Sequence, residues 1–302
     1  MRYLVIGDNE APERTAALAI RWGVGLECTT FYDTNYLEEH PNGIAEYLQV
    51  VDGVCYKTMH GPFTGLNTGV RDRMIRDVTL LRYTQACETA QKLGIRDIVI
   101  HNNWYDYCAP RNVWRVNTRQ LFAELMKRID GCDVCFHLEN TLERDCELMK
   151  EVVLETGSPK LDICLDIGHT QGMVHGGMTA LEWIEQCGSL IGHVHLHNNH
   201  GQRDEHNNLP DGTLPMPEIL AALEERRPTP AGAWNAEGIR GRMRPLRWNI
   251  LTAWAILKKQ KRGCGFEEDC DFRHGRNAGR LHVSMELHSG QHAVSVWISD
   301  DG

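Results

Sequence analysis

Short apolar runs alternate along the sequence with longer stretches whose apolar residues recur at helical spacing, and this alternation restricts the fold most. The runs of strand length cover residues 2–6, 24–30, 54–60, 97–101, 134–139, 161–166, 191–197 and 232–237. Helices are predicted over residues 71–93, 117–129, 145–155, 178–187, 216–225 and 246–259. Eight strands that alternate with helices form a closed (β/α)8 barrel, the TIM barrel, over about 250 residues. We therefore predict an α/β protein with this fold. The main alternative, an open doubly wound sheet, often carries a Gly-rich fingerprint that this sequence lacks.

The pattern changes from residue 263 onward. Residues 264–270 are polar and rich in turn formers. Residues 281–287 and 292–298 then alternate with period two around Ser289, Gly290 and Gln291, which is typical of a β-hairpin. We therefore divide the chain into a barrel over residues 1–262 and a C-terminal extension with a short hairpin over residues 263–302. The sequence assigns no role to this extension.

The composition is that of a globular protein, with 42% hydrophobic and 24% charged residues. No apolar run approaches the roughly 18 residues that cross a membrane. The 11 cysteines are scattered and odd in number, as expected for reduced thiols, so a cytoplasmic protein is predicted. The net charge of −9 argues against a protein that holds nucleic acid mainly by neutralising phosphates. The net charge does not exclude a local basic groove. The sequence also leaves open whether the protein forms a homo-oligomer.

Six consecutive predicted strands, from the third to the eighth, carry a histidine or a carboxylate near their C-terminal ends. In chain order these residues are His60, His101, Glu139, Asp166, His195 and Glu237. Because the strands of a barrel converge at this face, the six side chains are expected to surround one centre. Carboxylates crowded together repel one another unless a cation is present. Imidazole and carboxylate are ligands of zinc, manganese, cobalt and iron, so the pattern predicts a divalent-metal enzyme.

Further histidines lie beside these strand ends. The spacing Asp166-x-x-His169 allows both side chains to bind one metal, or His169 to face the substrate. His193, His195 and His197 alternate along the seventh strand and therefore point to the same side. We expect His193 to pack in the core, whereas the sequence leaves open whether His195 or His197 is the ligand.

Polar residues outside the strands extend the predicted site. Asp204 and His206 follow the seventh strand in a loop, where they are either additional ligands or part of a solvated charged loop. Trp104, Asn140 and Arg203 are candidates for shaping a substrate pocket.

Taken together, these motifs resemble the xylose isomerase-like barrel superfamily. This superfamily contains sugar isomerases and epimerases and also DNA-repair enzymes of the endonuclease IV type. The resemblance covers roughly residues 1–262 and is carried by His60-Gly-Pro-Phe, Gln-Lys-Leu-Gly94, Ile-Val-Ile-His101, Leu-Glu139-Asn, Cys-Leu-Asp166-Ile-Gly-His169, His-Val-His195-Leu-His, Asp204-Glu-His206 and Glu237. As a set the motifs are specific for the superfamily, and not for one activity within it.

Resemblance to the epimerase branch implies one divalent metal, manganese, cobalt or zinc. Its ligands would be the residues that match the branch's pattern, Glu139, Asp166, His195 and Glu237. The two glutamates would move a proton at the carbon beside a carbonyl, through an enediolate that the metal stabilises. His169 would complete the catalytic group at the sugar. The remaining candidates for binding the sugar are His60, His101, Trp104, Asn140 and Arg203.

Resemblance to the endonuclease branch implies three zinc ions and cleavage of a phosphodiester in abasic DNA. All nine residue types of that pattern are present, as His60, His101, Glu139, Asp166, His169, His195, Asp204, His206 and Glu237. The loop over residues 31–39 is acidic, however, and repels phosphates. We therefore favour a sugar or polyol isomerase or epimerase. A barrel that binds metal and carbohydrate without turnover is a third alternative, which the two glutamates argue against.

Overall fold

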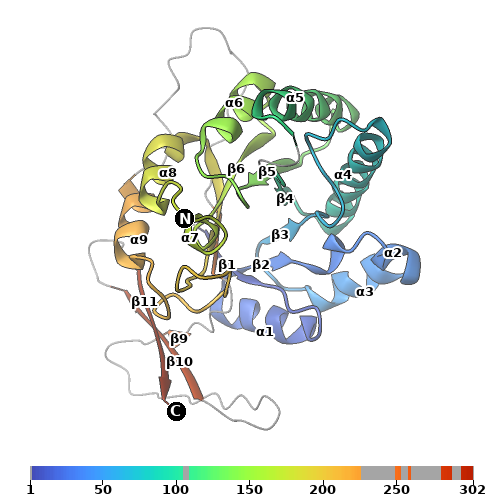
Figure 1. Ribbon diagram of the computed structural model, residues 1–302. Helices are drawn as coiled ribbons and strands as arrows, with labels where there is room; N and C mark the ends of the chain where they lie inside the picture. Colours follow the sequence, from blue (N-terminus) through green and yellow to red (C-terminus); the bar gives the residue numbers. More distant parts are fainter. Residues whose placement is uncertain are drawn as a thin grey trace.

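The computed structural model describes residues 2–104 and 109–225, together with the backbone of four strands at 249–252, 258–259, 280–287 and 294–301. In this part of the chain, eight parallel strands close a barrel in chain order (Figure 1). They are β1 (Arg2–Ile6), β2 (Gly25–Cys28), β3 (Lys57–His60), β4 (Asp97–His101), β5 (Cys135–Glu139), β6 (Leu161–Asp166), β7 (Ile191–Leu196) and β8 (Asn249–Thr252). The prediction of a TIM barrel is confirmed, and β4 and β6 have the predicted bounds.

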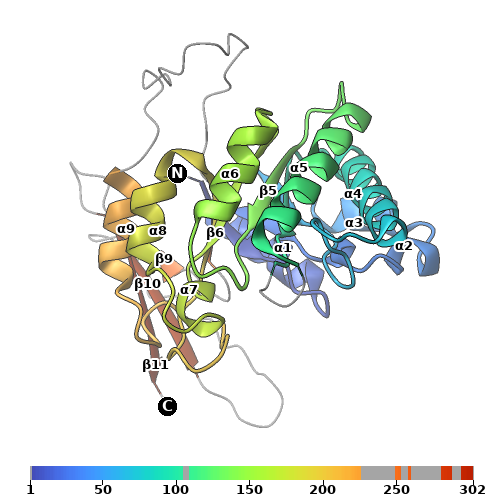
Figure 2. The ribbon, with the colours of Figure 1, turned by 45° about the horizontal axis from the view of Figure 1, so that its top comes forward.

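Helices surround the strands, and α4 packs beside α5, α5 beside α6, and α8 beside α9 (Figure 2). The described helices are α1 (Pro12–Trp22), α2 (Tyr36–Glu39), α3 (Gly43–Val50), α4 (Arg73–Leu93), α5 (Arg111–Arg128), α6 (Glu147–Thr156), α7 (His169–Gly172), α8 (Ala180–Cys187) and α9 (Met216–Glu225), with 3-10 turns η1 (Thr30–Tyr32) and η2 (Gly188–Leu190). The helical periodicity predicted α4, α5, α6, α8 and α9.

The longest of these helices, α4, shows how local sequence sets the bounds. The carboxylate of Asp72 caps its start, because Oδ1 accepts hydrogen bonds from the backbone nitrogens of Met74 at 2.8 Å and Ile75 at 3.3 Å. Gly94 ends it in a left-handed conformation with φ of 68°. No helix in the described ranges is long and apolar enough to span a membrane.

The eighth strand is not where the sequence pattern predicted it. β8 is formed by Asn249–Thr252, which pairs with β1 on one side and β7 on the other, whereas residues 246–259 were predicted to be helical. A short apolar run such as Ile250-Leu251 suits a buried strand and a buried helix equally. The barrel decides between them, because the open edges of β1 and β7 offer backbone hydrogen bonds on both sides. The predicted strand 232–237, with Glu237, lies outside the described residues.

A second sheet is formed near the C-terminus, in the order β11-β10-β9. Strands β10 (Arg280–Leu287) and β11 (Val294–Asp301) are antiparallel, and β9 (Lys258–Lys259) runs parallel to β10. Since β9 comes from residues assigned to the barrel and pairs with the extension, the boundary at residue 262 stays a prediction.

A β-bulge sets the register between β6 and β7. Ile163 is level with Ile191, but Cys164 is level with His193, so one residue of β7, Gly192, is extra. A Cβ atom at Gly192 would lie 2.0 Å from Oδ2 of Asp162, and only glycine fits this close approach. The bulge brings His195, and not Val194, level with Asp166.

Candidate metal centre

The C-terminal ends of β3 to β7 bring histidines and carboxylates together at one face of the barrel. The strand register places His101 level with Glu139 and Asp166 level with His195. Among the described residues, ligand atoms gather in four groups, one of which is Cys164, His193 and His195. The other three adjoin one another at this face, and Glu139 belongs to two of them. These three groups are His60, His101 and Glu139; Glu139, Asp166 and His195; and His169, His197, Asp204 and His206.

The first group surrounds one oxygen of Glu139. Oε2 lies 3.4 Å from Nε2 of His60 and 3.4 Å from Nε2 of His101, and this buried oxygen accepts no hydrogen bond from any described residue. His60 Nδ1 lies 3.0 Å from the carbonyl oxygen of Gly61. A carbonyl only accepts, so Nδ1 carries the proton and Nε2 keeps its lone pair. Burial lowers the pKa of His101 to about 4, which keeps its imidazole in the neutral form that binds metals.

The second group lies deeper and is formed by Glu139, Asp166 and His195, all of which are buried. Nδ1 of His195 is 3.1 Å from Oε1 of Glu139 and 3.5 Å from Oδ2 of Asp166. Asn140 holds the end of β6 in place, because its side chain accepts from the backbone nitrogen of Asp166 at 2.7 Å and donates to its carbonyl at 3.0 Å.

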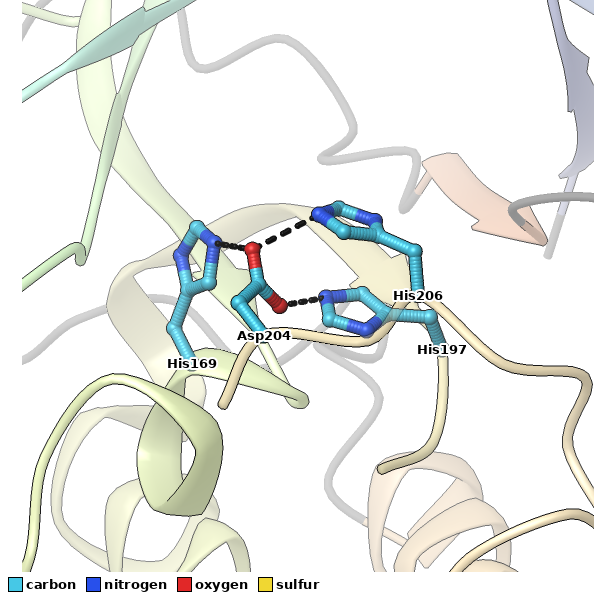
Figure 3. A group of neighbouring side chains, drawn as sticks. All are labelled: His169, His197, Asp204 and His206. Carbon is cyan, nitrogen blue, oxygen red and sulfur yellow. Dashed lines mark hydrogen bonds and ion pairs between the residues drawn. The ribbon is translucent and has the colours of Figure 1, made fainter. Parts of the chain in front are cut away.

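The third group is built around Asp204 (Figure 3). Its Oδ2 lies 3.3 Å from Nε2 of His169 and 2.7 Å from Nε2 of His206, and its Oδ1 lies 3.7 Å from Nε2 of His197. Nδ1 of His169 donates to the carbonyl of Asn140 at 2.7 Å, which leaves Nε2 to face Asp204. The structure therefore places Asp204 in contact with His169, His197 and His206, in a loop that also leaves His206 partly exposed to solvent.

His197 connects the second and third groups. Its Nε2 is 2.9 Å from Oδ1 of Asp166, and its ring stacks on that of His206 with centroids 4.0 Å apart. The side chain is fully buried. Since His195 faces Glu139 as well as Asp166, the geometry favours His195 as the strand-seven ligand of the second group, with His197 between the two.

Some of the spacings between these atoms match those between the ligands of a tetrahedral metal ion. A zinc ion with ligand bonds of about 2.0–2.1 Å has neighbouring ligand atoms about 3.3–3.4 Å apart. The contacts from Glu139 Oε2 to the two histidines of the first group are 3.4 Å, and the contact from His169 to Asp204 is 3.3 Å. The unpaired Oε2 of Glu139, together with a donor set of imidazoles and carboxylates, therefore suits a divalent cation.

The carboxylates of the centre are ionised in spite of their burial. Burial raises the pKa of Glu139, but His195 and His101 outweigh it and hold the pKa well below its usual range. For Asp166, His169 and His197 outweigh burial in the same way. A low pKa means that both groups offer anionic oxygens to a cation near neutral pH.

Two predicted substrate-binding residues, Trp104 and Arg203, make side-chain contacts outside the three ligand groups. Trp104 is buried, and its indole nitrogen donates to the carbonyl of Ala109 at 3.3 Å. Arg203 is 81% exposed and lies 3.6 Å from Glu205. His193 is completely buried, in the place expected for a core residue. Glu237 lies outside the described residues, so its position stays a prediction.

Sequence reasoning missed one charged residue next to the centre. Glu27 on β2 is completely buried and lies 3.2 Å from Nε2 of His195 and 3.0 Å from Nε2 of His193. The sequence signal for Glu27 is a glutamate within an otherwise apolar strand, Gly-Leu-Glu-Cys. A buried charge without a partner is costly, so a glutamate in such a strand indicates a partner inside the barrel.

A closed TIM barrel with histidines and carboxylates gathered at its C-terminal mouth defines the class of protein. Within that class, the family described as xylose isomerase-like TIM barrel matches residues 25–233. The chain belongs to this family. The prediction drawn from the strand-end motifs is confirmed at this level.

Solved structures share this fold. A D-tagatose 3-epimerase-like protein matches with a TM-score of 0.64 and 23% identity, over 84% of this chain and 90% of that one. The IolI protein with a bound zinc atom matches with a TM-score of 0.61 and 17% identity, over 83% of this chain and 88% of that one. D-psicose 3-epimerase from Clostridium cellulolyticum H10, with D-tagatose, matches with a TM-score of 0.59 and 18% identity, over 83% of this chain and 84% of that one.

A similar sequence is the uncharacterized protein MJ1311 of Methanocaldococcus jannaschii. It is 27% identical over 201 residues, which are 64% of this chain and 68% of that protein. At these identities the structural matches show a common fold, and the activity has to be argued from the site.

Proposed function

We propose that this protein is a divalent-metal-dependent isomerase or epimerase that acts on a sugar or polyol. The observation that carries the proposal is the buried group of Glu139, Asp166 and His195, whose ligand atoms meet at 3.1–3.5 Å at the mouth of the barrel. Support comes from proteins of similar fold. Two of them are named as a D-tagatose 3-epimerase-like protein and a D-psicose 3-epimerase, and a third protein, IolI, holds a zinc atom.

In the proposed site, Glu139, Asp166 and His195 hold the metal, and Glu237 is the expected fourth ligand. When bound, the metal supplies Lewis-acid stabilisation of negative charge on a substrate oxygen. Glu139 is buried in this group beside His195, and its carboxylate is the group we assign to accept a proton from the carbon next to a carbonyl. His169 lies 3.6 Å from Oε1 of Glu139, and its position suits an orienting contact to the same substrate.

The first test is deuterium incorporation from D2O into a panel of ketoses, measured by NMR on protein loaded with manganese, cobalt or zinc. Exchange at the carbon that epimerises is expected for the correct sugar. Glu139→Gln is expected to lower kcat by about 10²- to 10⁴-fold, because it removes the proton acceptor. Glu151→Gln is the matched control, since Glu151 pairs with Arg115 on the surface at 3.4 Å. Full activity of Glu139→Gln would contradict the assignment.

A second candidate function is favoured by the third ligand group. His169, Asp204 and His206 add a third set of ligand atoms beside the other two, and a centre with three zinc ions suits phosphodiester hydrolysis. Metal content measured by plasma mass spectrometry separates the two candidates. One ion per chain supports the epimerase, and three zinc ions with cleavage of abasic-site DNA support the phosphodiesterase. The acidic residues Asp33, Glu38 and Glu39 beside β2 favour the sugar substrate.

A further inference from the structure

Glu27 is a buried carboxylate that the proposed reaction does not use. It lies on β2, inside the barrel, with no exposed surface. Burying a lone charge is costly unless partners compensate it. Glu27 has partners on two other strands: Thr58 donates to its Oε2 at 2.9 Å, and Nε2 of His193 lies 3.0 Å from the same oxygen.

The second oxygen of Glu27 faces the metal ligand His195. Its Oε1 lies 3.2 Å from Nε2 of His195, an ion-pair contact, and neither of these two buried atoms has a hydrogen-bond partner among the described residues. On the opposite edge of the ring, Nδ1 faces Glu139 at 3.1 Å and Asp166 at 3.5 Å. The imidazole therefore lies between the metal group on one side and Glu27 on the other.

Nδ1 of His195 faces the other two members of the second group, and Nε2 faces Glu27. A histidine ligand usually gives its second N–H to a carboxylate, which fixes the tautomer and the ring orientation. A proton on Nε2, held by Glu27, leaves the lone pair of Nδ1 directed at Glu139 and Asp166. The contacts to Thr58 and His193 keep the carboxylate of Glu27 in place, so that it cannot follow a rotating ring.

We propose that Glu27 is a positioning residue, which holds His195 as the Nε2–H tautomer and thereby directs Nδ1 to the metal. The proposal rests on the metal centre of the proposed function, but not on its substrate. It also distinguishes His195 from His197, which follows β7 and faces Asp166 through Nε2 at 2.9 Å.

The native protein provides the first test. Histidine side-chain ¹⁵N NMR on the zinc-loaded chain reports which ring nitrogen of His195 carries a proton, with the signals assigned by His195→Gln. A proton on Nε2 and zinc on Nδ1 are expected. Zinc on Nε2, or a chain that takes up no zinc at His195, would overturn the proposal, and neither result depends on a variant that folds.

The second test is a cobalt titration of the wild type and Glu27→Gln, followed by the visible absorption of bound Co²⁺. Asp166→Asn identifies the part of the signal that belongs to the second group. Glu27→Gln is expected to weaken the cobalt affinity of the second group by about 10- to 100-fold, because a neutral amide is a weaker acceptor for the N–H of His195 than a carboxylate. Glu151→Gln is the matched control, because Glu151 is a surface carboxylate that pairs with Arg115 at 3.4 Å, and a change below about threefold is expected.

Two results of this titration would contradict the proposal. One is an unchanged cobalt affinity in Glu27→Gln. The other is a thiolate-to-cobalt charge-transfer band, because it would place the metal at Cys164, His193 and His195, whose ligand atoms also lie within 4.8 Å of one another. The sugar assay is independent of both: a chain that binds cobalt through Nδ1 but exchanges no sugar hydrogen overturns the proposed function and leaves the role of Glu27 intact.

Discussion

His137 lies two residues before Glu139 on β5 and is buried between two carboxylates. Its Nε2 lies 3.0 Å from Oδ1 of Asp97, and its Nδ1 contacts Asp162. Tyr56 donates to the other oxygen of Asp97. Burial lowers the pKa of His137, but Asp162 and Asp97 outweigh it and raise the pKa to about 10. The barrel core thus contains a protonated histidine between two carboxyl groups, one layer below the metal groups.

This charge arrangement makes stability depend on pH. The unfolded pKa of histidine is about 6.5, below the folded value of about 10. The contribution of protonated His137 to the free energy of unfolding is therefore complete below about pH 6.5 and is lost as the pH rises towards 10. On the acid side, the pKa of Asp97 is lowered to about 2, so its contribution is lost as the pH falls from about 4 to 2.

Asp97→Asn is expected to lower the free energy of unfolding by about 3 kcal/mol near pH 6, because it breaks a buried pair. It is also expected to flatten the decline in stability between pH 6.5 and 10. Urea unfolding at a series of pH values measures both effects. Glu124→Gln, which removes an exposed pair with Arg128, serves as the control and is expected to cost below about 0.5 kcal/mol. Equal losses in the two variants would show that the core pair is not specially stabilising.

At the scale of elements, the turn from β6 into α7 touches the third ligand group. A Cβ atom at Gly168 would lie 1.9 Å from Cε1 of His197, although φ of −67° and ψ of −36° suit any residue. The constraint on this glycine is therefore the ring of His197, and not the backbone. Because His197 stacks on His206 and contacts Asp166, a displaced ring disturbs both neighbouring groups.

Gly168→Ala is accordingly expected to lower metal affinity at His169, Asp204 and His206 by at least about 10-fold, as measured by competition with a chromogenic chelator. The double variant with His197→Ala relieves the clash, so its unfolding free energy is expected to exceed that of Gly168→Ala. A double variant no more stable than the single one would mean that the clash is absorbed elsewhere.

At the scale of the whole molecule, the metal groups are assembled only by the closed barrel. Their ligands come from β3, β4, β5, β6 and β7, from the start of α7 and from the loop that follows β7. The unfolded chain presents no such site, so binding of a metal stabilises the folded state by mass action.

Addition of metal at about 100 times its dissociation constant is therefore expected to stabilise the fold by about 2.7 kcal/mol, which raises Tm by about 5 °C in a protein of this size. Differential scanning fluorimetry with zinc, manganese or cobalt measures the shift, and a chelator should reverse it. Asp166→Asn, which removes a ligand of the second group, is expected to reduce the shift. An equal shift in that variant would place the metal elsewhere.

The sequence alone determined the class of fold, most strand ends and the chemistry of the mouth. Periodicity and turn signals are local, so β4, β6 and α4 were readable from their own residues. The parallel alternation then required His60, His101, Glu139, Asp166 and His195 to meet at one face.

Tertiary structure decided what depends on neighbouring strands. The position of β8 followed from the open edges of β1 and β7, and the apolar run that forms it suited a helix equally. The bulge at Gly192 set His195 level with Asp166, and only the closed barrel placed Glu27 behind that ring. Register and side-chain contacts between strands far apart in sequence carry no local signal, because they arise from how the strands stagger when the barrel closes.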